Sequence, residues 1–151
     1  MLRPIHILLS IILLLTACSR QEPASLDKVP ERIISLAPDI TETVYALDLG
    51  DKLVGATTAC SYPEAAKEIP RVGGFGQFNF EAIVSLKPDL VILHANYENE
   101  KSRLDGLNIP YLQIKTRSMT DILAAIENIG GACGAKEEAD RLLGRIHKRL
   151  E

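Results

Sequence analysis

Few side chains in this sequence are of the types that carry out chemistry, and their spacing favours binding over catalysis. Three of the 151 residues are histidines, and His6 lies in an apolar N-terminal segment, which leaves only His94 and His147 for the rest of the chain. Two histidines cannot form a three-histidine transition-metal site. Asp39 and Glu42 have the spacing of a helix-capping pair, which explains them better than an acid–base role. The sequence has no G-x-S-x-G, H-E-x-x-H or phosphate-loop motif, so we predict no catalytic site, no metal site and no cofactor.

The cysteine Cys18 ends the sequence Leu15-Thr16-Ala17-Cys18, directly after an apolar run over residues 5–15. With Arg3, this run has the layout of a secretory signal, and it is shorter than the roughly 20 apolar residues of a membrane-spanning helix. The arrangement resembles the lipobox of bacterial lipoproteins, in which the cysteine is diacylated and becomes the new N-terminus. The alternative is an ordinary cleaved signal in which Cys18 falls there by chance.

We therefore expect residues 1–17 to be a lipoprotein signal peptide and Cys18 to be the lipidation site. Under either reading the protein is exported, to the periplasm or another extracytoplasmic space, and the lipid would anchor it to the membrane. Export excludes most ATP-dependent and NAD-dependent chemistry.

The chain after the signal has 134 residues, with 16 Lys and Arg against 20 Asp and Glu, a net charge of −4. A mildly acidic domain has no basic patch for nucleic acid, so we predict no nucleic-acid partner. The length allows a hydrophobic core without disulfides. Cys60 and Cys133 would meet an oxidising compartment, and the sequence leaves open whether they form a bridge.

Apolar runs and helical stripes alternate along the chain after a polar tether at residues 18–30. Short apolar runs predict strands at residues 33–36, 53–57, 90–93 and 111–114, and a loop-rich stretch covers residues 58–77. Helical stripes cover residues 39–49, 80–86, 98–107, 118–133 and 136–151, and either Gly134 or the pair Gly130-Gly131 ends the fourth of them. Asn79 and Ser118 stand at N-cap positions.

This alternation predicts an α/β fold with a parallel sheet, right-handed crossovers and helices on both faces. In such folds ligands bind beyond the carboxyl ends of the strands. The loops that begin at Ala37, Thr58 and His94 are therefore the expected ligand-binding loops.

One segment carries a family resemblance. Residues 71–92, R-V-G-G-F-G-Q-F-N-F-E-A-I-V-S-L-K-P-D-L-V-I, resemble the central stretch of the cobalamin and ferric-siderophore periplasmic binding proteins. R-I-I-S-L-A-P at residues 32–38 before Thr41-Glu42, and Val54-Gly55 before Tyr62-Pro63, extend the resemblance to residues 31–151. It implies the substrate-binding component of an ABC importer, whose partners are a permease and its ATPase subunits. It also implies a Rossmann-like lobe as one half of a two-lobed protein.

Proteins of that family are about twice as long as this chain. The resemblance therefore implies an N-terminal substrate-binding lobe at residues 31–134 and the start of the interlobe helix at residues 135–151, with the second lobe absent. A truncated single-lobe sensor or interaction domain, or a non-functional remnant, is the alternative. Related lobes occur in metallocluster and chelatase enzymes, but those are cytoplasmic and need ligating cysteines or histidines that this chain lacks.

The resemblance also implies ligand-contacting residues. Phe75 aligns with a pocket tryptophan of the cobalamin binders, where a flat ring stacks on the ligand, although it can equally fill the core. His94 aligns with a pocket aromatic and is read as a solvated strand-end residue, a hydrogen-bond donor or, least favoured, a metal ligand. Pro38 and Tyr62 are expected at the same rim.

The small metal-chelate ligand implied is cobalamin or another corrinoid, then a ferric siderophore, then haem. The Gly-rich loop around Phe75 has no basic cluster suited to an anionic siderophore. Phe78 and Phe80 are expected in the core, and Cys60 is expected to be a small buried apolar residue.

Glu81 is the residue predicted to dock onto the permease. It falls in the first turn of the helix at residues 80–86, where the helix dipole alone is a sufficient reason for a carboxylate. By resemblance, it occupies the position of an exposed glutamate that pairs with arginines of the membrane permease, and this is the reading we favour.

Overall fold

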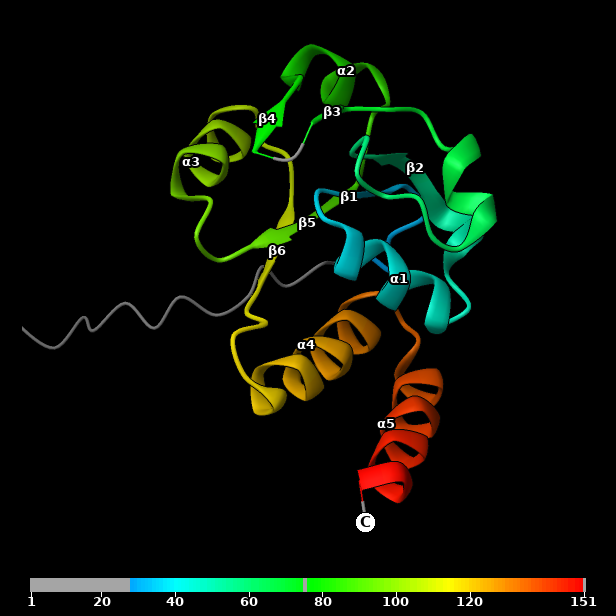
Figure 1. The fold of residues 1–151 in the computed structure, drawn as a ribbon. Coiled ribbons are helices and arrows are strands. Elements are labelled where there is room, and N and C mark those ends of the chain that lie inside the picture. The colour runs from blue at the N-terminus through cyan, green and yellow to red at the C-terminus, as the bar shows by residue number, and fades with distance from the viewer. Residues whose placement is uncertain (1–27, 75, 151) are drawn as a thin grey trace, which may run out of the picture.

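The computed structural model describes residues 28–74 and 76–150 (Figure 1). Cys18, the expected signal peptide and Phe75 lie outside the described residues, as does the expected tether up to residue 27. Within residues 28–74 and 76–150, no helix is both long and apolar enough to cross a membrane.

Four parallel strands form the central sheet. They are β1 (Ile33–Ser35), β2 (Leu53–Ala56), β5 (Leu90–His94) and β6 (Tyr111–Ile114), in the order β2-β1-β5-β6. Each of the four predicted strands is present, and the predicted parallel sheet is confirmed.

Most residues of the strands are apolar because helices cover both faces of the sheet. Side chains alternate between the two faces with a period of two residues. One face buries Ile33, Leu90 and Ile92. The other face buries Ile34, Val91 and Leu93.

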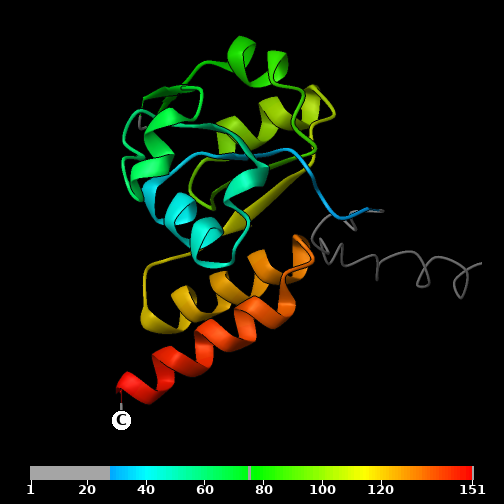
Figure 2. The same ribbon diagram turned by 90° about the vertical axis from the view of Figure 1, so that its right-hand side faces the viewer.

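The first face is covered by α1 (Pro38–Ala46) and α4 (Met119–Ala132), and α5 (Lys136–Leu150) packs on α4. Figure 2 shows α5 lying along α4, on the side away from the sheet. The two helices approach closely at Gly130, where an added Cβ would lie 2.5 Å from Cβ of Ala139. Gly130 therefore belongs inside α4, and Gly134, with a φ of 70°, follows its C-cap Cys133.

The second face is covered by α2 (Phe80–Ser85) and α3 (Glu98–Gly106). Asn79 caps α2 as predicted, since its side-chain oxygen accepts a hydrogen bond from Ala82 N at 3.0 Å. The expected core roles of the two phenylalanines are confirmed: Phe80 is buried, and Phe78 packs against the same cluster.

The stretch between β2 and α2 has more structure than the expected loop. It contains the 3₁₀ helix η3 (Glu64–Glu68) and a small antiparallel hairpin of β3 (Gly73–Gly74) and β4 (Gln77–Phe78). A further 3₁₀ turn, η2 (Gly50–Lys52), precedes β2.

The capping interpretation of Asp39 and Glu42 is wrong. The N-cap residue is Ala37, which has no side chain that can cap, and Pro38 takes the first helical position, where its missing N–H costs nothing. Asp39 is therefore already inside the first turn. The helix also ends at Ala46 and not near Gly50, because Asp48 adopts a φ of 58° that stops it.

Cys60 and Cys133, the cysteines among the described residues, are buried and free, so they do not form a bridge. Cys60 is fully buried, as expected, with Sγ 3.2 Å from the Thr57 hydroxyl. Burial raises the pKa of the Cys133 thiol to about 12, which keeps it protonated and unreactive.

Candidate functional site

The carboxyl ends of β5 and β6 meet at one edge of the sheet and border a cavity. Its volume is about 370 Å³. It is lined by the last residue of each strand and the residues that follow: His94, Ala95, Asn96, Ile114, Lys115, Thr116 and Arg117. The cavity therefore lies where open α/β sheets bind ligands.

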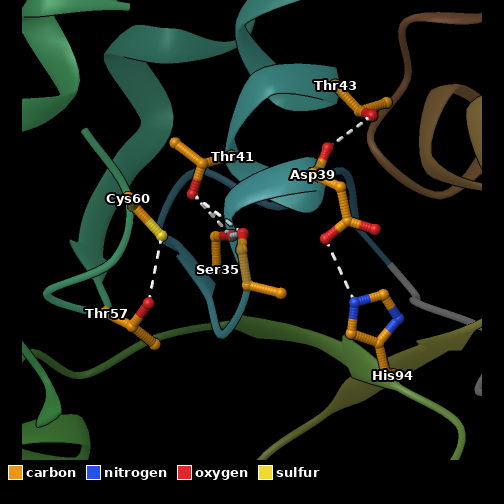
Figure 3. A network of polar contacts seen from close by, with 8 residues as sticks. Ser35, Asp39, Thr41, Thr43, Thr57, Cys60 and His94 are labelled. Atoms are coloured by element: carbon orange, nitrogen blue, oxygen red, sulfur yellow. Dashed lines mark hydrogen bonds and ion pairs between the residues drawn. The ribbon is translucent and has the colours of Figure 1, made fainter. Parts of the chain in front are cut away.

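His94 is held at this edge by Asp39 of α1 (Figure 3). His94 Nε2 lies 3.1 Å from Asp39 Oδ1, and the His94 side chain is 17% exposed while that of Asp39 is 45% exposed. A carboxylate can only accept, so Nε2 carries the proton and donates it. In the neutral ring this leaves Nδ1 as an acceptor.

Asp39 is kept ionised by its neighbours. Burial acts to raise the pKa of its carboxyl, but the hydrogen bond and charge of His94 act against burial, together with hydrogen bonds from the Ile40 backbone and the Thr116 side chain. The pKa of Asp39 consequently lies below its ordinary value of 3.8. Thr116 also lines the cavity.

Buried hydroxyl groups fix the turn between β1 and α1, which carries Pro38 and Asp39. Ser35 Oγ donates to Ala37 O at 2.9 Å, and the Thr41 hydroxyl donates to Ser35 Oγ at 2.8 Å. Both side chains are fully buried (Figure 3). Buried polar groups that are satisfied in this way hold one conformation, so Asp39 is presented to His94 from a rigid support.

Aromatic rings continue from His94 into the second face of the sheet. The Tyr97 ring lies 6.4 Å from that of His94, tilted by 46°. Phe78 meets Tyr97 edge-on, with 5.2 Å between ring centroids. Burial raises the pKa of Tyr97, with smaller contributions from Glu100 and Asp39.

Tyr62 lies in the loop after β2 and is 68% exposed. Arg71 fixes this loop, because its guanidinium donates to the carbonyl oxygens of Thr57, Cys60 and Lys67, each at 3.0 Å. Tyr62 is not among the residues that line the cavity at His94.

The structure thus joins some of the predicted residues and separates others. His94 and the turn that holds Pro38 come together through Asp39, whereas Tyr62 stands apart and Phe75 is outside the described residues. The residues that sequence reasoning missed are Asp39, Lys115 and Arg117. Ligand-binding loops were expected only after the first three strands of the sheet. Lys115 and Arg117 follow the fourth strand, and the same rule applied to that strand would have identified them.

Glu81 lies elsewhere, on a groove between α2 and α3. The groove has a volume of about 630 Å³ and is lined by Phe80, Glu81, Val84, Ser85, Arg103, Gly106 and Leu107. Val84 and Leu107 are 45% and 44% exposed, and the Arg103 guanidinium lies 3.8 Å from the centre of the Phe80 ring. This is an apolar surface with one acidic and one basic residue beside it.

Within the described parts of the chain, no three His, Cys, Asp or Glu side chains form a group that could hold a metal ion. The geometry at His94 is therefore that of a polar cavity with an oriented imidazole.

The sequence matches the profile of a known protein family, described as "Periplasmic binding protein", over residues 33–151. The chain belongs to the periplasmic binding protein family. This confirms the resemblance seen in residues 71–92.

Relatives within the family carry informative names. An uncharacterized ABC transporter substrate-binding lipoprotein, YvrC of Bacillus subtilis, is 38% identical over 135 residues, which are 86% of this chain and 43% of that protein. A vitamin B12-binding protein of Vibrio vulnificus is 41% identical over 108 residues, which are 70% of this chain and 40% of that protein.

Solved structures of the family share the fold. The periplasmic vitamin B12 binding protein BtuF of Vibrio cholerae superposes with a TM-score of 0.74 at 35% identity, covering 81% of this chain and 49% of that one. A periplasmic heme binding protein from Pseudomonas aeruginosa gives a TM-score of 0.75 at 25% identity, covering 80% and 44%. The chain spans about half the length, or less, of these relatives.

Proposed function

We propose that this chain is the ligand-binding lobe of an extracytoplasmic solute-binding component of an ABC importer. It captures a corrinoid or a ferric chelate and delivers it to the permease without a chemical step. The observation that carries this proposal is the polar cavity at the carboxyl ends of β5 and β6, in a chain that belongs to a family of binding proteins.

The preferred ligand is cobalamin or another corrinoid, followed by a ferric siderophore and then haem. The relatives named for vitamin B12 are up to 41% identical to this chain, whereas the haem binder described above is 25% identical. Phe75 would stack on the flat face of the ligand, and the oriented His94 ring would hydrogen-bond to its edge. Pro38 and Tyr62 would contact the ligand from the rim.

A titration followed by visible absorbance tests the capture function. Aquocobalamin, haemin and a ferric catecholate are each added to the purified chain, and we expect a saturable spectral change with at least one of them. The absence of saturable binding for all three would overturn the proposal. A Soret or corrin band shift that disappears in His94→Ala would be needed before metal ligation is claimed.

Docking onto the permease is proposed for the groove between α2 and α3. Glu81 offers a carboxylate that can pair with a permease arginine in a defined geometry, and the apolar side chains of Val84 and Leu107 are exposed beside it. The α2–α3 groove and the cavity at His94 are formed by different elements, so capture and delivery can be separated by substitution.

Membrane attachment is proposed through a lipid on Cys18. Support comes from the lipobox-like sequence and from the relative in Bacillus subtilis, which is named a lipoprotein. The lobe would then work in the periplasm or an equivalent extracytoplasmic space.

A further inference from the structure

Two basic residues stand on the wall of the cavity at His94. Lys115 and Arg117 directly follow β6, both are exposed, and both line the cavity. Across residues 28–74 and 76–150, neither side chain takes part in an ion pair or a hydrogen bond that would neutralise it. Two positive charges therefore stand on the cavity wall, and neither has an ion-pair partner among the described residues.

The carboxylate of Asp39, beside the cavity at His94, is already engaged. Asp39 Oδ1 accepts a hydrogen bond from His94 Nε2 at 3.1 Å. The remaining polar lining residue is Asn96, whose amide has two N–H donors.

We propose that this cavity is an oxyanion subsite, in which Lys115 and Arg117 hold a carboxylate or phosphate group of the captured ligand. A guanidinium presents a planar fork of N–H donors that fits both groups, and an ammonium adds a point charge. The inference rests on the proposed function, because it assigns an anionic group to the ligand that this lobe captures.

The subsite narrows the chemistry of the ligand. A corrinoid with a nucleotide tail offers a phosphodiester, haem offers two propionates, and many siderophores offer carboxylates, whereas a neutral chelate offers nothing to these cations. The Gly-rich loop around Phe75 indeed has no basic cluster. The cations come instead from the residues that follow the fourth strand, β6.

Anion binding is tested first with simple probes. Inorganic phosphate and succinate are titrated separately into the purified chain at constant ionic strength, and the backbone amide resonances of residues 115–117 are followed by NMR. We expect saturable shifts with at least one anion, weakened by about tenfold or more in Lys115→Gln with Arg117→Gln. Tighter binding of phosphate would indicate a phosphoryl group on the ligand, and tighter binding of succinate would indicate a carboxylate.

The matched control is Lys28→Gln with Lys87→Gln, which removes the same charge. Both lysines are exposed and precede β1 and β5, so they lie at the opposite edge of the sheet. The control should bind the anions as the original chain does. The subsite is refuted if neither anion gives saturable shifts at residues 115–117, or if the two double variants lose binding equally.

A second titration keeps the two proposals apart. If aquocobalamin or haemin binds and the Lys115/Arg117 double variant binds it just as tightly, the subsite has no role in capture while the proposed function stands. If the anions bind and no chelate does, the subsite stands and the proposed function fails.

Discussion

His94 Nε2 lies 3.1 Å from Asp39 Oδ1, and this contact ties the end of β5 to the first turn of α1 across 55 positions of sequence. Both residues stand at the carboxyl edge of the sheet, where β1 and β5 are neighbours. A strand-end imidazole that would otherwise rotate freely is thereby fixed in one tautomer, with Nε2 protonated. The pair is therefore a positioning device for whatever the cavity binds.

Replacing Asp39 by Asn should reveal the lowered pKa of its carboxyl as a pH-dependent loss of stability. A depressed pKa in the folded state stabilises the fold above the ordinary value of 3.8, and this contribution is lost as the pH falls through the lowered value. We expect the original chain to be more stable than Asp39→Asn at about pH 5, by less than about 1 kcal/mol because the side chain is 45% exposed. Urea unfolding should show the difference closing towards about pH 2. A gap that is constant with pH would exclude this role for the charge.

The strands of the central sheet and the α-helices were predictable from the sequence because each follows a local pattern. The run at residues 90–93 is apolar on every residue, as a strand covered on both faces requires, and β5 occupies Leu90–His94. Asn79 and Ser118 are N-caps because their short polar side chains satisfy a backbone N–H three residues on.

The site was harder to predict, because it is assembled from segments that are distant in the chain. The local sequence around Asp39 suggests a helix cap, and this interpretation is wrong. Asp39 meets His94 because β1 and β5 are neighbours in the sheet. Lys115 and Arg117 look like ordinary surface charges until β6 is found next to β5. Strand order depends on contacts between distant segments, so the hydrophobic pattern within one segment cannot predict it.

Removing His94 should weaken ligand binding while leaving the fold intact. We expect His94→Ala to reduce chelate affinity by about 0.5–1.5 kcal/mol, the net value of a typical hydrogen bond. Isothermal titration calorimetry measures this change. His147→Ala is the matched control, because His147 is exposed on α5, which packs on α4 at the far side from the sheet. Equal affinities for the two variants would remove His94 from the ligand site.

Arg71 should control the order of the loop that carries Tyr62. Its guanidinium satisfies three carbonyl oxygens between Thr57 and Lys67, so Arg71→Ala leaves them without that partner and should lower the free energy of unfolding by about 1–3 kcal/mol. Arg71→Lys keeps the charge but loses the planar fork, and it should recover only part of the loss. Urea unfolding gives the stability, and amide hydrogen exchange over residues 57–63 reports the loop. Full recovery by lysine would mean that charge alone matters.

Cys18 should carry the lipid. Because the lipobox-like sequence puts Cys18 at the cleavage point, cells that express the full chain with labelled palmitate should incorporate label into it, and Cys18→Ser should abolish the incorporation. Cys60→Ser is the control, since this thiol is fully buried in the folded lobe. Incorporation that survives Cys18→Ser would show that the signal is an ordinary one.

Reversing the charge of Glu81 should separate delivery from capture. Glu81 lies on the α2–α3 groove and not in the cavity at His94, so Glu81→Lys should leave chelate affinity nearly unchanged. At the permease, the new lysine side chain would face arginines, and two positive charges placed together at an interface can cost several kcal/mol of binding free energy. Ligand-stimulated ATPase activity of a reconstituted importer should therefore fall while binding persists. Glu137→Lys, on the exposed first turn of α5, makes the same charge change on the opposite face of the sheet and should keep activity. If Glu81→Lys supports the original rate, or if Glu137→Lys lowers it equally, Glu81 is an ordinary helix-start residue and the docking surface lies elsewhere.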